Sequence, residues 1–417
     1  MSEKSKVIRE CERLNRTRKV YYEKVNYPTF FQNVKGNLLI SGLGADNEEL
    51  ITDLVCGYIQ RDNMPTIFLT SHINVLQNIQ ERQNIGEIER VMISCLDSCN
   101  YHPFYGMSKQ QILRIVQMTI SEMGFGNQID NVLVYASALM DIVSVKYPVS
   151  LPAITKLLQN DDDFIAGLAI QSGLSNIIAD NVRGNHEAGI VFRRICEKLE
   201  EVFECVYESG SDTKYNFQSG VLGNVSMVFY PIACNQRIMN SYLKEELYSS
   251  LKRVPKIRLI IDEIEFTAED DELLKIIFDY KRQGKIELIV LSVNVQESLY
   301  NNELDFANIV MFKHSMPMIT EEISRKMFGT YLYHYPAPTV GRPPALVITL
   351  KKDIHWHIVT EERLRVRDID LYREPTLFGT EINYLIIKMA NKPDVYLINE
   401  RDFFMKQKDK LLPGVSL

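Results

Sequence analysis

Short apolar runs alternate with amphipathic helical segments along two stretches of the chain. The runs are rich in branched residues and only a few residues long, as buried strands are. The helical segments between them carry apolar residues three and four positions apart. Such alternation predicts a mostly parallel sheet with helices on its faces. The strand-like runs are residues 37–41, 66–70, 90–94, 223–233, 257–266, 286–294 and 308–315.

Helical periodicity alone fills the segment between these two stretches, from Met107 to Gln218. Its clearest helical segments are residues 111–123, 131–145 and 190–206. In VSLPAITKLLQ, Ser150 is expected to cap a helix that carries a proline in its first turn. The pattern therefore predicts an all-helical module inserted into an α/β domain.

These changes of pattern divide the chain into four parts. Residues 1–34 are a basic, partly helical lead-in, and residues 35–106 and 219–315 together form a discontinuous α/β domain. Residues 107–218 form the helical module. Residues 316–417 are a small α+β appendage, with a β-hairpin and short closing elements, and docking is a role that suits such an appendage.

Composition narrows the class of protein. The chain has 417 residues, 46% hydrophobic and 24% charged, which is ordinary for a soluble globular protein. No apolar run approaches the length of a membrane span, and the charged N-terminus lacks a signal-peptide core. Seven scattered cysteines suit a reducing cytoplasm. A net charge of −7 does not favour an obligate nucleic-acid binder, although a local basic strip for DNA contact stays open.

The first candidate site is the strand, glycine turn and helix at residues 37–60. This is the shape of a phosphate-binding (Walker A) loop, whose pattern is GxxxxGK[ST]. Counting from Gly42, and passing Gly44, the second glycine position is Asn47, the lysine position is Glu48 and the Ser/Thr position is Glu49. No Lys or Arg lies between Lys35 and Arg61 to replace the missing charge.

Two glutamates in this loop oppose a nucleotide. One charge pair about 4 Å apart is worth on the order of 4 kcal/mol at an effective dielectric of 20, and Lys to Glu turns attraction into repulsion. The local alternative is a capping box, with Asp46 as N-cap and Glu49 three residues later. Acids there also complement the helix dipole. We therefore interpret the loop as a structural remnant.

The second candidate site is the acid pair Asp262–Glu263, which ends the strand-like run IRLIIDEIEF. In an active ATPase the aspartate would hold the water shell of Mg²⁺ and the glutamate would be the general base for the attacking water. The alternative is that both acids face solvent or pair locally.

The order of these parts resembles the FtsK–HerA branch of P-loop ATPases, and within it the coupling ATPases of conjugation and type IV secretion. The resemblance implies a RecA-like fold. It also implies a Walker B role for Asp262 and Glu263, and a polar sensor at Asn294 or Gln296. Four ordered matches carry it: the loop at residues 37–60, CNYHPF at 99–104, RLIIDEIEF at 258–266, and YKRQGKIELIVLSVNVQESL at 280–299.

The resemblance also sets expectations about partners. In these relatives the helical insert recognises cargo, so residues 107–218 are the expected partner surface. Rings of this branch complete each site with an arginine from the neighbouring subunit. Lys281 and Arg282 occupy the basic position of the family stretch, with solvated helix-end charges as the alternative.

We therefore expect a degenerate, non-hydrolysing ATPase-fold subunit, a pseudo-ATPase, that acts as a scaffold or adaptor in a multi-protein assembly. No cofactor is expected. The assembly would be linked to DNA mobilisation, secretion or mobile-element defence, with protein partners such as an active ATPase, in a homo- or hetero-oligomeric ring. The alternative is an active motor that uses Mg-ATP with Asp262 and Glu263. A third class, an unrelated α/β interaction protein, leaves the ordered matches accidental.

Other candidates are weaker. His355 and His357 share one face of a strand, but no third ligand is evident, so an ordinary hairpin strand is the interpretation. Residues 160–163 (NDDD) are expected to form a solvated loop, and the prolines of residues 333–350 an extended linker.

Overall fold

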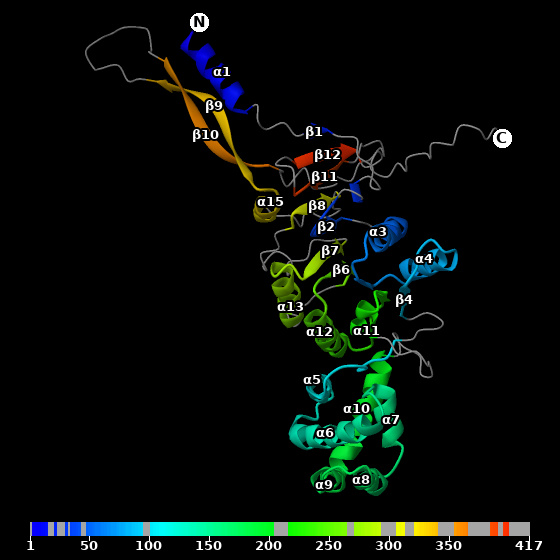
Figure 1. Cartoon of the computed structure of the whole chain (residues 1–417). Helices are drawn as coiled ribbons and strands as arrows, with labels where there is room; N and C mark the ends of the chain where they lie inside the picture. Colours follow the sequence, from blue (N-terminus) through cyan, green and yellow to red (C-terminus); the bar gives the residue numbers. More distant parts are fainter. Residues whose placement is uncertain are drawn as a thin grey trace, which may run out of the picture. The chain divides into compact units, whose positions relative to one another are not determined.

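A computed structural model gives the fold shown in Figure 1. It describes residues 2–15, 21–22, 30–31, 34–42, 47–94, 101–203, 216–264, 271–292, 306–312, 321–340, 354–365, 384–390 and 395–399. The chain separates into two compact units, one of Met1–Gly44 and Ser292–Leu417 and the other of Ala45–Leu291. The division into four parts made from the sequence stays a prediction.

The Ala45–Leu291 unit is built on five parallel strands, in the order β7-β6-β3-β5-β4. Every residue of these strands is buried, so both faces of the sheet are covered. Strands of this kind are near-continuous apolar runs, which is why they stand out in the sequence. The strands are β3 (Thr66–Thr70), β4 (Val91–Ile93), β5 (Ser226–Phe229), β6 (Ile257–Asp262) and β7 (Ile286–Ser292).

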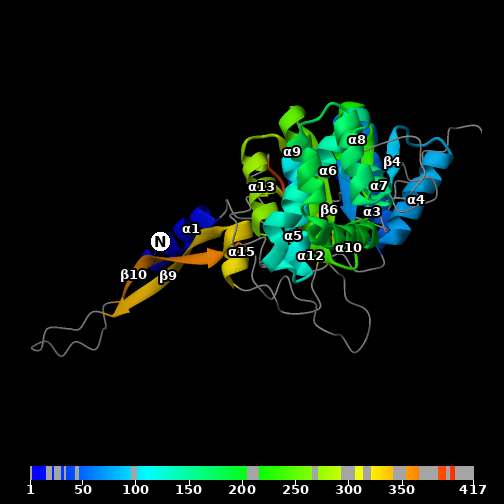
Figure 2. The same ribbon diagram turned by 90° about the horizontal axis from the view of Figure 1, so that it is seen from below.

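Two pairs of helices cover this sheet. Helix α3 (Glu48–Arg61) packs against α4 (Ile73–Asn84), and α12 (Gln236–Arg253) packs against α13 (Asp271–Arg282). The two pairs lie on opposite sides of the strands (Figures 1 and 2). Gly284 follows α13 with a φ of +71°, the left-handed conformation that ends helices. The predicted α/β class, a mostly parallel sheet with flanking helices, is confirmed.

The helical module lies between β4 and β5, which are adjacent parallel strands. Ser150 caps α7 as predicted, and its side chain accepts a hydrogen bond from the Ala153 N–H. The inserted all-helical module is thus present. Its helices are α5 (Lys109–Glu122), the short 3₁₀ turn η3 (Gly126–Gln128), α6 (Ile129–Lys146), α7 (Leu151–Leu158), α8 (Asp162–Gln171), α9 (Asn176–Arg183) and α10 (His186–Phe203), and α11 (Phe217–Leu222) leads back to β5.

A buried polar cluster ties the start of this module to α12. The Glu246 side chain is completely buried, and its Oε1 accepts a hydrogen bond from the Phe217 N–H at 2.7 Å. The Tyr101 hydroxyl donates to the same oxygen at 3.3 Å and is also hydrogen-bonded to the Tyr242 hydroxyl. Tyr101 belongs to the CNYHPF segment, so that segment has a structural role at this junction.

One described helical segment, Gly126–Lys146, is long and apolar enough to cross a membrane by length and composition. Within it, α6 packs against α5, α7, α9 and α10. Side chains such as Tyr135, Leu139 and Ile142 are buried there. Packing in the module accounts for the apolar character of this helix, and the cytoplasmic location stays a prediction.

The other unit holds a second set of strands, in the order β1-β12-β11-β8-β2. Strands β2 and β8 are parallel, whereas β11 runs antiparallel to both β8 and β12. This unit also contains a long antiparallel hairpin, β9 with β10, against which α1 packs. The elements are α1 (Glu3–Asn15), β1 (Tyr21–Tyr22), β2 (Leu38–Ser41), β8 (Asn308–Met311), α15 (Glu321–Phe328), β9 (Thr330–Val340), β10 (Ile354–Leu364), β11 (Tyr384–Lys388) and β12 (Val395–Asn399).

The hairpin corrects the prediction of a proline-rich linker. Strand β9 runs through Pro336 and Pro338, which pair with Ile358 and Trp356 of β10. The backbone N–H and C=O of His334, two residues before Pro336, are both hydrogen-bonded to the Asn15 side chain of α1. The backbone polar groups of His334, and of every second residue along β9 from it, therefore point away from β10. Prolines at the same parity remove no hydrogen bond from the hairpin, and an edge strand tolerates them.

Candidate functional site

The acid pair lies where two parallel strands end side by side. Thr70, the last residue of β3, pairs with Asp262, the last residue of β6. The Asp262 side chain is fully buried, and its Oδ2 accepts a hydrogen bond from the Thr70 hydroxyl at 2.6 Å. Asp262 therefore pairs locally rather than facing solvent. The carboxyl edge of a parallel sheet is also where ligands of α/β proteins bind.

His72 joins both acids of the pair. Its Nδ1 lies 3.0 Å from Asp262 Oδ2, and its Nε2 lies 2.9 Å from Glu263 Oε2. The hydrogen bond with Asp262, reinforced by the charges of Asp262, Glu263 and Glu48, raises the pKa of His72 to about 9 despite partial burial. The imidazole is therefore a cation at neutral pH, and both ring nitrogens donate to carboxylates.

His72 was not foreseen from the sequence. It lies two residues after the strand TIFLT, next to Ser71, and nothing in the sequence pairs it with residue 262. The only signal is a histidine at the carboxyl end of a predicted strand. Its partners become evident once β3 and β6 are known to be neighbours.

Glu263 is held in an unusual backbone conformation. Its φ is +50°, in the left-handed region that non-glycine residues rarely adopt. Its N–H donates to the Leu291 carbonyl oxygen at 3.1 Å, which fixes the backbone there. A general base must reach a water molecule, whereas one carboxylate oxygen of Glu263 is bonded to His72.

The start of α3 corrects the predicted capping box. The N-cap residue is Asn47, not Asp46, and the Asn47 side chain makes no capping hydrogen bond to the helix. Glu49 is therefore the second helical residue and lies outside the third position that a capping box requires. Glu48 instead accepts a hydrogen bond from the Asn74 side chain of α4 at 2.8 Å, which accounts for its position. Asp46 itself lies outside the described residues.

Thr52, one turn into α3, uses its hydroxyl hydrogen within the helix. Its Oγ1 donates to the Glu48 carbonyl oxygen at 2.8 Å, the usual bond of a helical threonine to the preceding turn. The first turn of α3 thus presents carboxylates, and the only basic residue in α3 is Arg61 at its far end.

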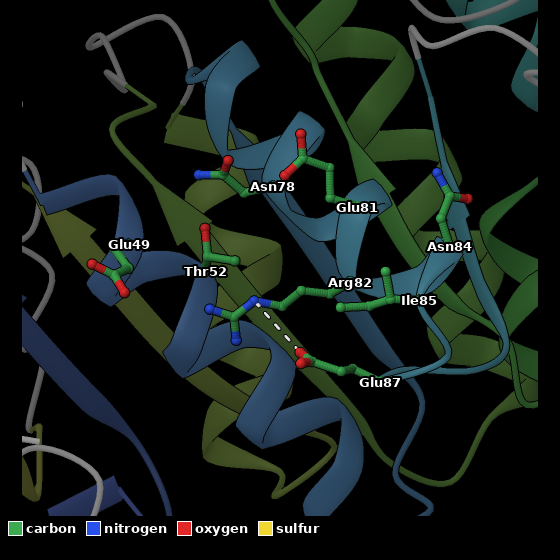
Figure 3. A pocket seen from close by; sticks show the side chains of 8 residues that line it. All are labelled: Glu49, Thr52, Asn78, Glu81, Arg82, Asn84, Ile85 and Glu87. Carbon is green, nitrogen blue, oxygen red and sulfur yellow. Dashed lines mark ion pairs between the residues drawn. The ribbon is translucent and has the colours of Figure 1, made fainter. Parts of the chain in front are cut away.

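A pocket of about 650 Å³ adjoins this first turn, between α3 and α4. Figure 3 shows the Arg82 side chain reaching across it. That guanidinium is engaged by acids: it is paired with Asp53 and lies 3.9 Å from a Glu87 carboxylate oxygen. The lining residues are Glu49, Thr52, Asn78, Glu81, Arg82, Asn84, Ile85 and Glu87, three carboxylates against one cation.

The charges of these residues oppose a triphosphate. The described part of the loop region offers no lysine to the phosphates, and Glu48 and Glu49 add negative charge there. Beside Asp262 stands an imidazolium, which repels a second cation. The imidazolium of His72 and the two acids are matched to one another in charge.

The remaining predicted site residues fall elsewhere. Gly42 belongs to the other unit, with a φ of +86°, and a Cβ there would lie 2.7 Å from the Phe312 carbonyl oxygen, so only glycine fits. Gly44, Asn294 and Gln296 lie outside the described residues. Lys281 and Arg282 end α13, where Arg282 pairs with Asp279 on the preceding turn.

Two secondary candidates have structural contacts. His355 and His357 lie on β10, where His355 is 3.8 Å from Glu3 and His357 is hydrogen-bonded to Thr339 at 2.8 Å. The expectation of a solvated loop at residues 160–163 was wrong. Asp161 caps α8, and Asp162 is buried against Tyr135, His186 and Arg193.

Comparison with known proteins gives structural likeness only. No protein family and no curated protein matches the sequence. Three solved structures of a bacterial conjugative coupling protein, TrwB, resemble the chain. The unbound monoclinic form has a TM-score of 0.48 at 11% identity, covering 93% of this chain and 90% of that one.

The trigonal form with sulphate has a TM-score of 0.47 at 11% identity, covering 95% and 92%. The complex with the non-hydrolysable ATP analogue ADPNP has a TM-score of 0.48 at 10% identity, covering 93% and 91%. These are the kind of protein that the ordered motifs resemble. Likeness of this degree carries no argument about what this chain binds or does.

Proposed function

We propose that the chain is a non-hydrolysing subunit with an ATPase-type fold, which acts as a scaffold or adaptor in a multi-protein assembly. The observation that supports this most is the bridge from His72 to Asp262 and Glu263. It places a side-chain cation on the two acids that an active ATPase needs for its metal ion and its attacking water.

Electrostatics at the start of α3 point the same way. Each unfavourable charge pair at about 4 Å costs on the order of 4 kcal/mol at an effective dielectric of 20. Since about 1.4 kcal/mol is a factor of ten in affinity, Glu48 and Glu49 together weaken triphosphate binding by several orders of magnitude. Arg82, the cation among the residues that line the pocket beside Glu49, is already paired with Asp53.

The biological process in which the chain acts is inferred from the ordered sequence motifs rather than from the site. DNA mobilisation, secretion and mobile-element defence are the processes in which the resembling ATPases work. In that setting the chain has protein partners in the cytoplasm, an active ATPase among them, and takes a place in a homo- or hetero-oligomeric ring. A subunit of this kind contributes binding surfaces without turnover of its own.

Calorimetry with Mg-ATP tests the proposal. The wild type is expected to show no binding at up to millimolar nucleotide, whereas Glu48→Lys with Glu49→Thr is expected to gain measurable affinity. Glu197→Lys, a charge reversal at an exposed residue of α10 in the helical module, is the matched control and is expected to gain none. Tight binding of Mg-ATP by the wild type contradicts the proposal.

The alternative is an active ATPase, and one observation favours it. Asp262 Oδ1 is buried and has no hydrogen-bond partner among the described residues, as an oxygen reserved for a metal-bound water would be. If the alternative holds, the wild type hydrolyses ATP and Glu263→Gln abolishes hydrolysis while the protein stays folded. Phosphate release measured on both proteins separates the two functions.

A further inference from the structure

A second cavity, of about 450 Å³, lies inside the helical module and away from the acid pair. It is formed by the end of α6, one face of α7 and Leu168 of α8, with His102 also on its wall. Its volume is that of a small-molecule site. Figure 2 shows α6, α7 and α8 grouped together in the module.

The wall of this cavity is mostly apolar. Ile142 and Val143 of α6, Leu157 of α7 and Leu168 of α8 contribute aliphatic side chains. Tyr147, 62% exposed, stands at the end of α6 and is accessible to solvent. An apolar wall with an accessible aromatic side chain suits an apolar body that enters from solvent.

The frame around the cavity is fixed by hydrogen bonds. The Ser150 side chain caps α7, and the Leu151 N–H donates to the Pro103 carbonyl oxygen at 3.4 Å, beside His102. Asp161 caps α8 by accepting from the Phe164 N–H at 2.7 Å. The connection between α6 and α7 and the connection between α7 and α8 are thus both fixed by hydrogen bonds, so the cavity is preformed.

The charge of the cavity is the opposite of that of the chain. The protein as a whole carries 54 acidic and 47 basic residues, but the lining of this cavity contains Lys146 and Lys156 and no carboxylate. Both lysines are exposed, and neither forms an ion pair within the described part of the chain.

Nearby acids are already paired with other cations. Asp141, one turn before Lys146, is bound by Lys109 at 2.7 Å. Asp162 binds Arg193, and Asp163 binds Arg183. Lysines near helix C-termini also complement the helix dipole, which accounts for their charge but not for the cavity beside them.

We propose that this cavity binds a small amphipathic carboxylate, with its apolar body against α6, α7 and α8 and its carboxylate held by Lys146 and Lys156. The ligand is a free small molecule. Neither the acid pair nor nucleotide binding takes part, so this site and the proposed function stand or fall separately.

Fluorescence titration with 8-anilinonaphthalene-1-sulfonate, an aromatic body with one anionic group, tests the site. Binding is expected to saturate at one site and to be displaced by decanoate but not by decanol. Lys146→Gln with Lys156→Gln is expected to weaken binding at least tenfold. Ala153→Trp, which fills the cavity from α7, is expected to abolish it, while Lys256→Gln, an exposed lysine elsewhere, leaves it unchanged.

Lysine acetylation read by mass spectrometry gives a second measurement that needs no variant. Decanoate is expected to protect Lys146 and Lys156 and to leave Lys256 reactive. The proposal is overturned if decanoate protects neither Lys146 nor Lys156, or if the dye binds all variants equally. It is also overturned if only a peptide with a free C-terminal carboxylate, and no free fatty acid, displaces the dye. Thermal unfolding of each variant confirms that it is folded.

Discussion

Two buried carboxylates in the same unit have partners of different charge. Asp262, at the carboxyl edge of the sheet, is fully buried and lies against the His72 cation and the Thr70 hydroxyl. Glu246, at the junction of the helical module and α12, is also fully buried, but its partners are neutral: the Phe217 N–H and the Tyr101 hydroxyl. Burial raises the pKa of Glu246 to about 8.

The difference shows what a buried acid requires. An ionised carboxylate taken out of water is stable only with a charged partner or several donors, and otherwise it keeps its proton. Glu246 follows the second course and is a neutral acid at the pH of most cells. Asp262 has a charged partner in His72, and the same cation also pairs with Glu263, the second acid of the candidate site.

Removing the cation is expected to have the largest effect. His72→Ala leaves Asp262 buried without its counter-charge, and breaking a buried pair in this way costs about 3–5 kcal/mol. Urea unfolding followed by circular dichroism at pH 7 measures the loss. His72→Ala combined with Asp262→Asn is the control, because removing both charges is expected to recover much of the stability. A loss below about 1 kcal/mol in the single variant contradicts the assigned bridge.

Glu246 gives an effect that depends on pH. Because the pKa of Glu246 in the folded state is raised to about 8, the folded protein keeps a proton that the unfolded chain releases near pH 4.5. The unfolded state therefore binds fewer protons between these values, and stability falls as the pH rises from 4.5 to 8. Glu246→Gln is expected to remove this fall and to be more stable than the wild type by a few kcal/mol above pH 8.

His72 also makes the free energy of unfolding fall as the pH rises, but over a higher pH range than Glu246. The raised pKa of His72 means that its stabilisation is complete below about pH 6.5 and is lost as the pH rises through 9. Unfolding curves from pH 5 to 10 for the wild type and Glu246→Gln therefore separate the two groups. If the free energy of unfolding of Glu246→Gln still falls below pH 8 as steeply as that of the wild type, another residue causes the fall.

The smallest effect is expected at an exposed ion pair. Arg282 and Asp279 lie one turn apart at the end of α13, with side chains 72% and 55% exposed. Arg282→Ala is expected to change the free energy of unfolding by no more than about 0.5 kcal/mol, since solvent and salt screen such pairs. The same urea series measures it. A loss above about 1 kcal/mol means that Arg282 has a structural contact beyond this pair.

Much of the fold could be predicted because its strands are buried on both faces. The run at residues 66–70 is the strand β3 to the residue, and residues 257–262 form β6 within the longer predicted run. Predicted strands ran too long where apolar residues continue past the last paired residue, as in residues 223–233 around β5. β9 was not predicted because prolines argue against a strand. They are tolerated here because their backbone faces away from β10, a fact that depends on the pairing of β9 with β10.

The candidate site was only half predictable. Asp262 and Glu263 stand out because acids end an apolar run. His72 does not, because its role depends on which strands are neighbours, and strand order is a property of the whole sheet. Glu48 was expected to act within its own helix turn, whereas it is bonded to Asn74 of the next helix, a contact that no local pattern contains.

The position of the helical module has a consequence for how such a chain can change. The module leaves the sheet after β4 and returns before β5, and these strands are neighbours about 4.8 Å apart. An excursion of more than a hundred residues thus leaves at the carboxyl end of one strand and returns at the amino end of its neighbour, as a connection between parallel strands must. Such a module is a cassette: it can be exchanged, enlarged or reduced to a short crossover while the sheet, and the acids at its edge, keep their register.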